Sequence, residues 1–199
     1  MSQKDKQTIH NYMLTIITDT STLAVSLTSL KAHLGITTSS EDTRLTALIY
    51  SAQKAIENMV DGCLVLTPTV FDWTLPSFHS SRIALPMPPL NVLTSIKYYD
   101  SDNSQQTLNS NSYYVVASSF APSFVQTKTS WPSTYSRPDA VVFRFTAGFS
   151  TVPPDLAFCV LSLAASWNEN REAELAGTIT TEIKLGVDRV LRAWNWGSY

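Results

Sequence analysis

Apolar residues recur every three or four positions in four stretches of this chain, which is the spacing of an amphipathic helix. The clearest stretch starts after two candidate N-caps, Ser39 and Ser40, and ends at Asp61-Gly62. Its apolar positions are Leu45, Leu48, Ile49, Ala52, Ile56, Met59 and Val60. A shorter helix is predicted before it, from a cap at Ser26 to a stop at Gly35.

The other two helical stretches lie near the end of the chain. Pro153-Pro154 is typical of a first helical turn, and the apolar pattern continues to Ala173. One stripe is formed by Leu156, Val160, Leu163 and Trp167. Because Phe158, Leu161 and Ala165 cover much of the remaining circumference, this helix must be buried on more than one side. We expect these three residues to contact a neighbouring subunit. A short last helix is predicted from Gly186 to Trp194.

Between these helical regions the pattern changes to the two-residue period of a strand. Residues 69–75 alternate in this way, with Phe71 and Trp73 on one face. Further strands are expected at residues 81–85, 92–99, 113–117, 123–127 and 140–147. Short strands separated by turns rich in Pro, Asp and Ser favour a compact antiparallel sandwich or barrel.

The chain is therefore expected to be an α+β protein, a small helical bundle with an inserted antiparallel β-sandwich or barrel. The N- and C-terminal helices form the bundle together because each has an apolar face that must be buried. The helices that start near Ser40 and Pro153 are expected to pack against each other. The expected parts are an N-terminal arm at residues 1–24, a discontinuous helical core at 25–62 and 152–194, the β insertion at 63–151 and a tail at 195–199. The arm is interpreted as a segment that orders only against another surface.

The composition narrows the classes of partner. Charged residues make up 15% of the chain and the net charge is −2, whereas nucleic-acid affinity comes largely from clustered Lys and Arg. No such cluster is present in the sequence. The longest apolar stretch, Leu156 to Trp167, is shorter than the roughly 20 residues that span a bilayer. We therefore expect no membrane segment and no sequence-specific DNA binding.

The sequence offers no recognisable catalytic or metal site. His10, His33 and His79 are far apart in the sequence and belong to no known motif. Cys63 and Cys159 lack the spacing of metal ligands, and two free thiols are favoured over a disulfide. Nucleotide-binding and nucleophile motifs are absent. We expect no catalytic residues, no metal, no cofactor and no enzymatic activity.

Two other patterns leave alternatives open. Asp100-Ser-Asp-Asn103 is similar to part of a calcium loop, but the Gly and the distal Glu are missing, so a hairpin turn is favoured. An aromatic platform for sugars could form on the β region, although core packing is the commoner role of such residues. Its members would be Trp73, Tyr98, Tyr99, Tyr113, Tyr114 and Trp131. The alternative function is then a β-sandwich glycan- or receptor-binding module of a virion, which would leave the helices unexplained.

The order of segments over residues 25–193 resembles the head-to-tail connector (adaptor) family of siphophages and gene transfer agents. The most specific part is LPMPPLNVLTSIKYYD, from Leu85 to Asp100. A second is the junction from FTAGF to VPPDL at residues 145–156, and a third is Asn170-Arg-Glu after the long helix.

This resemblance implies a structural subunit that forms a ring of about twelve copies in the neck of a virion. The portal protein would lie above the ring and a stopper or tail-completion protein below it, with DNA passing through the lumen. The protein would be made in the host cytoplasm.

The resemblance also implies that the segment after the final helix docks on the portal. That segment contains Arg192, Trp194, Trp196 and Tyr199, and Trp and Tyr are favoured anchors of interfaces. The alternative is that this aromatic end folds back onto its own bundle.

Overall fold

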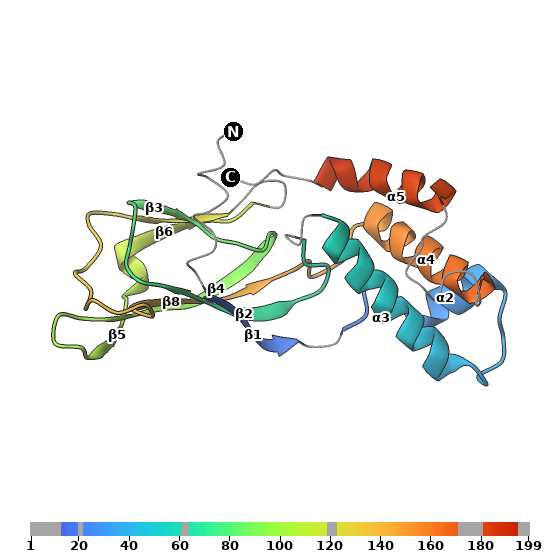
Figure 1. Ribbon diagram of the computed structural model, residues 1–199, viewed down its shortest axis with the longest axis horizontal. Helices are drawn as coiled ribbons and strands as arrows, with labels where there is room; N and C mark the ends of the chain where they lie inside the picture. Colours follow the sequence, from blue (N-terminus) through green and yellow to red (C-terminus); the bar gives the residue numbers. More distant parts are fainter. Residues whose placement is uncertain (1–12, 20–21, 61–63, 119–122, 171–180, 195–199) are drawn as a thin grey trace. The chain divides into compact units, whose positions relative to one another are not determined.

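The computed structural model describes residues 13–19, 22–60, 64–118, 123–170 and 181–194 (Figure 1). Within these residues the chain forms two compact units. The helical unit joins the segment that ends at Thr67 to the segment that begins at Phe149. The β unit contains strand β1 (Met13–Asp19) and residues Pro68–Gly148. The expected α+β class is therefore confirmed.

The helical unit contains α2 (Leu27–Leu34), α3 (Asp42–Met59), α4 (Pro154–Glu169) and α5 (Thr181–Trp194). Ser26 caps α2 as predicted, because its Oγ accepts a hydrogen bond from the Ser29 N–H at 3.0 Å. Gly35 ends the helix with φ of 69°, a left-handed conformation that glycine adopts without strain. Helix α5 begins five residues before the predicted Gly186. The predicted end of α4 at Ala173 lies outside the described residues.

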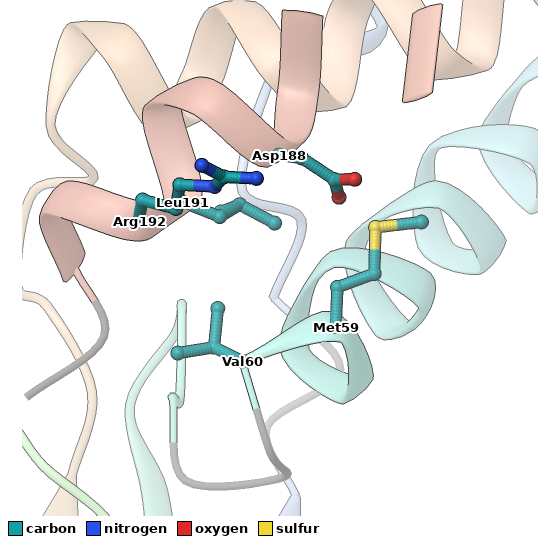
Figure 2. A pocket seen from close by; sticks show the side chains of 5 residues that line it. All are labelled: Met59, Val60, Asp188, Leu191 and Arg192. Carbon is teal, nitrogen blue, oxygen red and sulfur yellow. The ribbon is translucent and has the colours of Figure 1, made fainter. Parts of the chain in front are cut away.

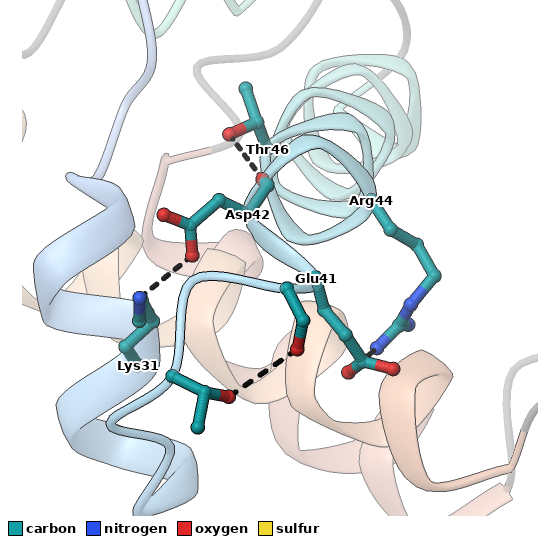
Figure 3. A network of polar contacts seen from close by, with 7 residues as sticks. Lys31, Glu41, Asp42, Arg44 and Thr46 are labelled. Carbon is teal, nitrogen blue, oxygen red and sulfur yellow. Dashed lines mark hydrogen bonds and ion pairs between the residues drawn. The ribbon is translucent and has the colours of Figure 1, made fainter.

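The start of α3 differs from the prediction. The cap position is Glu41, whose side chain makes no capping hydrogen bond, and Ser40 Oγ instead lies 3.5 Å from Thr38 Oγ1. Figure 3 shows Asp42 turned toward Lys31 of α2, at 2.7 Å, and Glu41 turned toward Arg44. The predicted cap at Ser39 or Ser40 is therefore wrong, and Glu41 and Asp42 form ion pairs that the sequence pattern does not reveal.

The core of the helical unit lies between α3 and α4, the two helices that were expected to pair. Their fully buried apolar side chains are Leu45, Ile49, Ala52 and Ile56 of α3 and Leu156, Val160, Leu163 and Ala164 of α4. Leu48 is partly buried against the same cluster. Helices α2 and α5 both pack on α4 and complete the unit (Figure 1).

Two buried polar residues of α3 hold the neighbouring backbone. Gln53 accepts a hydrogen bond from the Ala24 N–H at 2.9 Å and donates one to Thr67 Oγ1 at 3.0 Å. Glu57 accepts a hydrogen bond from the Leu66 N–H at 2.9 Å. A buried polar side chain is tolerated when it is hydrogen-bonded, and here each bond fixes a segment that enters or leaves the helical unit.

The β unit consists of two antiparallel sheets and is not a closed barrel (Figure 1). The first has the order β1-β2-β8-β4-β5 and the second the order β3-β7-β6. Their strands are β1, β2 (Thr69–Leu75), β3 (Arg82–Ala84), β4 (Leu90–Tyr99), β5 (Gln105–Thr107), β6 (Tyr113–Val116), β7 (Phe124–Thr127) and β8 (Val141–Ala147). Every predicted strand is present, and β5 was missed because its three residues are polar and exposed.

The inner face of the larger sheet is aromatic. Phe71 stacks on Phe145 and Trp73 packs against Phe143 across strands β2 and β8, with ring centroids 5.7 and 5.5 Å apart. Ile83 and Val125 of the smaller sheet are fully buried as well. The inner faces of the two sheets thus supply the core of a β-sandwich.

The expected N-terminal arm is, over Met13–Asp19, an edge strand of the β unit. It pairs antiparallel with β2, with Leu14 opposite Trp73 and Ile16 opposite Phe71. Residues 13–19 form a strand because they pair with β2, which lies far away in the sequence. The rest of the predicted arm lies mostly outside the described residues.

Candidate interaction surfaces

The described residues contain no group of three or more His, Cys, Asp or Glu side chains that could hold a metal ion. In the same part of the chain, no helix has the length and apolar character needed to cross a bilayer. His33 lies beside Phe158, with ring centroids 6.4 Å apart, and His79 is exposed in a loop. His10 lies outside the described residues. No pair of these histidines is therefore brought together in the part of the chain that is described.

Cys159 is a buried free thiol on α4. Burial, with a smaller contribution from the nearby Asp155 carboxylate, raises the pKa of the Cys159 thiol to about 11. Cys63 lies outside the described residues. Because the thiolate is the nucleophilic form, a raised pKa makes Cys159 inert at neutral pH.

We predict that Cys159 resists alkylation by iodoacetamide at pH 8 in the folded protein and reacts after unfolding in guanidinium chloride. The folded state holds the thiol proton more tightly than the unfolded state does. This contribution to stability is therefore complete below the usual thiol pKa and is lost as the pH rises from there toward about 11. Mass spectrometry of the peptide that contains Cys159 measures the alkylation. Rapid labelling of the native protein would contradict the buried position.

The acidic turn after β4 is a hairpin turn held by its own hydrogen bonds. Asp100 Oδ1 accepts hydrogen bonds from the backbone N–H groups of Asp102 and Ser104, each at 3.0 Å, and Oδ2 accepts one from Gln106 at 2.8 Å. The bond from Ser104 is the main reason that the pKa of Asp100 lies below its usual value. Both carboxylate oxygens thus accept hydrogen bonds within the turn. The sequence had favoured a hairpin turn over a calcium loop at this position.

The aromatic residues proposed as a sugar platform do not share one surface. Trp73 and Tyr113 are buried, whereas Tyr114 is exposed on the edge strand β6. Trp131 stacks on Phe78 with ring centroids 4.6 Å apart, and its indole N–H donates to the Ser80 carbonyl. The rings therefore serve packing at separate places, and this arrangement does not favour a glycan site.

A cavity of about 550 Å³ near the β4–β5 turn offers one cation, Arg137, which is already paired. Its guanidinium donates to both carboxylate oxygens of Asp139 at 2.6 Å and lies 3.8 Å from the centre of the Tyr99 ring. Its third partner is Asn103, at 3.1 Å. An anionic ligand would have to displace these contacts, so this cavity does not favour anion binding.

The three residues expected at a subunit interface differ in exposure. Phe158 is 60% exposed, Leu161 is partly buried against the helical core and Ala165 is only 8% exposed. Ala165 is already covered within its own unit because α2 and α5 pack on α4 as well as α3. Most apolar side chains around α4 are thus buried or partly buried within one chain, and Phe158 is the large apolar side chain of this helix that remains exposed.

Trp194 belongs to the helical unit and is only 7% exposed. Its indole N–H donates to Asp155 Oδ2 at 2.7 Å, and its ring meets the edge of Phe149 with centroids 5.5 Å apart. For this residue the structure shows the fold-back arrangement. Arg192 is exposed, and Trp196 and Tyr199 lie outside the described residues.

A pocket of about 180 Å³ lies between the C-terminal ends of α3 and α5. Figure 2 shows Met59 and Val60 of the α3 end on one side and Asp188, Leu191 and Arg192 of α5 on the other. For comparison, an apolar cavity of about 150 Å³ holds a benzene molecule. The pocket would therefore accept one side chain of a partner, and it does not suit a larger ligand.

The largest exposed apolar surfaces lie on two edge strands of the β unit. Strand β1 is one edge of the larger sheet and β6 is one edge of the smaller sheet. Their exposed apolar side chains are Met13, Leu14, Ile16 and Ile17 of β1 and Tyr114, Val115 and Val116 of β6. Exposed apolar surface of this kind marks interfaces with other proteins more often than sites for small molecules. These edges therefore indicate a protein that contacts other proteins in an assembly.

Residues 24–124 match the family model of phage gp6-like head-tail connector proteins. The match covers half of the chain, and the chain belongs to this family. It is a structural connector of the junction between head and tail. No curated protein matches the chain.

Chains of three solved particles share the fold. One is from the neck of an empty GTA particle computed with C6 symmetry, with 24% identity, a TM-score of 0.70, and coverage of 89% of this chain and 94% of the other. Another is from the virion of a native gene transfer agent (GTA) particle, with 23% identity, a TM-score of 0.71 and coverage of 94% and 97%. The third is from the neck of a native GTA particle computed with C12 symmetry, with 23% identity, a TM-score of 0.68 and coverage of 89% and 94%.

Proposed function

We propose that this chain forms a closed ring in the neck of a phage or phage-derived particle, beneath the portal protein and above a stopper or tail-completion protein. Membership of the head-tail connector family carries this proposal. A ring of about twelve copies fits the C12 symmetry named for a particle neck whose chain has the same fold. DNA would pass through the lumen without sequence-specific contacts, as the net charge of −2 suggests.

The proposed role is structural and requires no turnover, cofactor or metal. The described residues hold no cluster of metal-binding side chains, and the only described cysteine is a buried thiol with a raised pKa. Such a subunit would present surfaces that bind the portal protein on one side and the stopper or tail-completion protein on the other.

The contacts between copies would include Phe158 and Leu161 of α4. Phe158 is the large apolar side chain of this helix that remains exposed, and Leu161 is partly buried one turn away. Ala165 would contribute through its backbone or by shaping the surface, because its side chain is covered within the chain. A contact between two different surfaces of the same subunit is the type that closes a ring by rotation.

The contact with the portal would involve Arg192, Trp196 and Tyr199. Trp194 would anchor the segment to the helical unit through its hydrogen bond with Asp155, so that the residues after it leave from a defined position. Arg192 is exposed beside Trp194 and can form charge-assisted hydrogen bonds with a partner.

Electron microscopy of particle necks tests the proposed function. We expect a single ring of about twelve copies, with head-to-tail contacts between subunits, directly below the portal. Particles produced without this chain should be DNA-filled heads that lack tails. Isolated subunits or two-fold pairs on the portal would contradict the proposal.

A further inference from the structure

The exposed apolar side chains of the chain are concentrated on two strands. The described residues include ten large hydrophobic side chains that are exposed, and seven of them lie on β1 and β6. The other three are Val92 of β4, Phe158 of α4 and Tyr135 in the connection between β7 and β8. Scattered apolar residues are normal on a protein surface, but groups on sheet edges are not, because an open edge invites pairing with another strand.

The apolar inner face of the larger sheet extends onto strand β1, where it is exposed to solvent. Leu14 and Ile16 stand opposite Trp73 and Phe71, so they share the inner face with two buried aromatic residues. Ile16 is nevertheless 57% exposed. The larger sheet has five strands and the smaller has three, so the smaller sheet does not cover the whole inner face. In the described residues, β1 also carries no partner strand on its outer side.

Strand β6 presents the same combination of features on the smaller sheet. Val115 stands opposite the buried Val125, on the inner face, but is itself exposed. Tyr114 and Val116 point to the outer face, and Tyr114 is 57% exposed. Within the described residues, each edge therefore has backbone groups without a neighbouring strand, and apolar side chains on both faces. Each edge lacks a partner strand, and the other edge can supply one.

We propose that β1 of one copy pairs with β6 of the next copy, so that the two sheets join into one sheet across the subunit boundary. Strand addition at an open edge supplies main-chain hydrogen bonds for affinity, and alternate side chains supply specificity. Ile16 and Val115 would then meet on the inner face and complete its apolar layer. This inference rests on the proposed ring and specifies one of its contacts.

The two edges point to a second copy of this chain as the occupant, because a single contact of this type covers both of the edges that carry exposed apolar side chains. Pairing of β1 with another β1 would be a two-fold contact and would leave β6 open. Pairing of β1 with β6 uses two different surfaces of the same unit, which is the condition for a ring. Both strands belong to the β unit, so one rigid body carries the two edges.

A charge exchange tests this contact. Ile16→Glu alone and Val115→Lys alone should each reduce the number of necks that carry a ring by about tenfold or more, since a bare charge would enter an apolar contact. The double variant, Ile16→Glu with Val115→Lys in the same chain, should restore rings because every contact then pairs a carboxylate with an ammonium group. Each variant replaces the natural chain during particle production, and electron microscopy counts the necks.

Val92→Glu is the matched control. Val92 is 51% exposed and apolar like Ile16 and Val115, but it lies on β4, which is neither of the two strands in the proposed contact. This variant should form rings at the natural level, and the melting temperatures of all the variants should agree with that of the unaltered chain. A loss of rings with Val92→Glu equal to that with Ile16→Glu, or no restoration by the double variant, would overturn the pairing.

Cross-linking of the purified chain gives an independent result. In a background with Cys63→Ser and Cys159→Ala, Ile16→Cys and Val115→Cys are placed in separate chains and mixed with a thiol cross-linker that spans about 8 Å, the reach of diagonal neighbours on paired strands. We expect mixed 16–115 dimers to dominate. Dimers of 16–16 or 115–115 alone, or no dimers, would reject the proposal. If necks contain rings but both tests fail, only this contact is wrong, whereas necks without any ring of this chain would reject the proposed function itself.

Discussion

Replacement of Leu163 by alanine should lower the free energy of unfolding by about 2–5 kcal/mol, the range for removal of a fully buried leucine side chain. Leu163 lies on α4 at the contact with α3 and is fully buried. Denaturation in urea, followed by circular dichroism at the helical minimum, measures the change.

Phe158→Ala is the matched control for Leu163→Ala. It removes a larger side chain from the same helix, but one that is 60% exposed, so the free energy of unfolding should change by less than about 1 kcal/mol. Similar losses for the two variants would show that α4 does not present its Leu163 side to the core.

Replacement of Trp194 by alanine should cost about 3–5 kcal/mol, as for other large buried aromatic residues. The change removes the contact with Phe149 and leaves Asp155 without its indole donor. Deletion of residues 195–199 should instead leave the melting temperature unchanged, because the Trp194 anchor remains. Calorimetry on the two variants measures the difference.

The same pair of variants separates stability from portal binding. If the end of the chain docks on the portal, the deletion of residues 195–199 should weaken binding to purified portal while the fold is retained. Unaltered affinity of the truncated chain would reject that role for Trp196 and Tyr199. A large loss of stability on deletion would indicate that these residues also serve the fold.

The proposed contacts assign portal binding to the helical unit and contacts between copies to both units. The helical unit would bind the portal through the exposed Arg192 and the segment that follows it. Neighbouring copies would be held by β1 and β6 of the β unit and by Phe158 and Leu161 of α4. Binding at a ring edge and closure of the ring could then be altered separately by substitution, which the variants above allow to be measured.

The strength of the periodic patterns explains how much of the fold was predictable. Helices α3 and α4 were located, and their pairing was predicted, because each has a long apolar stripe that must be buried. The strands were found from their two-residue period, since residues such as Trp73 and Phe145 alternate with polar neighbours. The cap at Ser26 and the stop at Gly35 depend on local backbone geometry, which short sequence motifs encode well.

The interaction surfaces were less predictable, because exposure depends on which elements meet. The sequence showed that α4 is apolar around its circumference and that Trp194 lies near aromatic neighbours, but not that Ala165 and Trp194 are buried within one chain. Met13, Leu14, Ile16 and Ile17 were assigned to an arm, because the partner of their strand begins more than fifty residues later. No local signal indicates such a pairing, since the backbone hydrogen bonds of a sheet are the same for any two strands.

The sequence by itself determined the helices, most strands, the α+β class and the lack of a recognisable catalytic motif, because these follow from local periodicity and from residue types. Only the tertiary structure decided that β1 joins the sheet, that Gln53 and Glu57 hold the segments around α3, and that β1 and β6 remain open edges. These features arise from contacts between residues distant in the sequence. The free energy of these contacts depends on how distant segments pack together, which the sequence of one segment alone does not reveal.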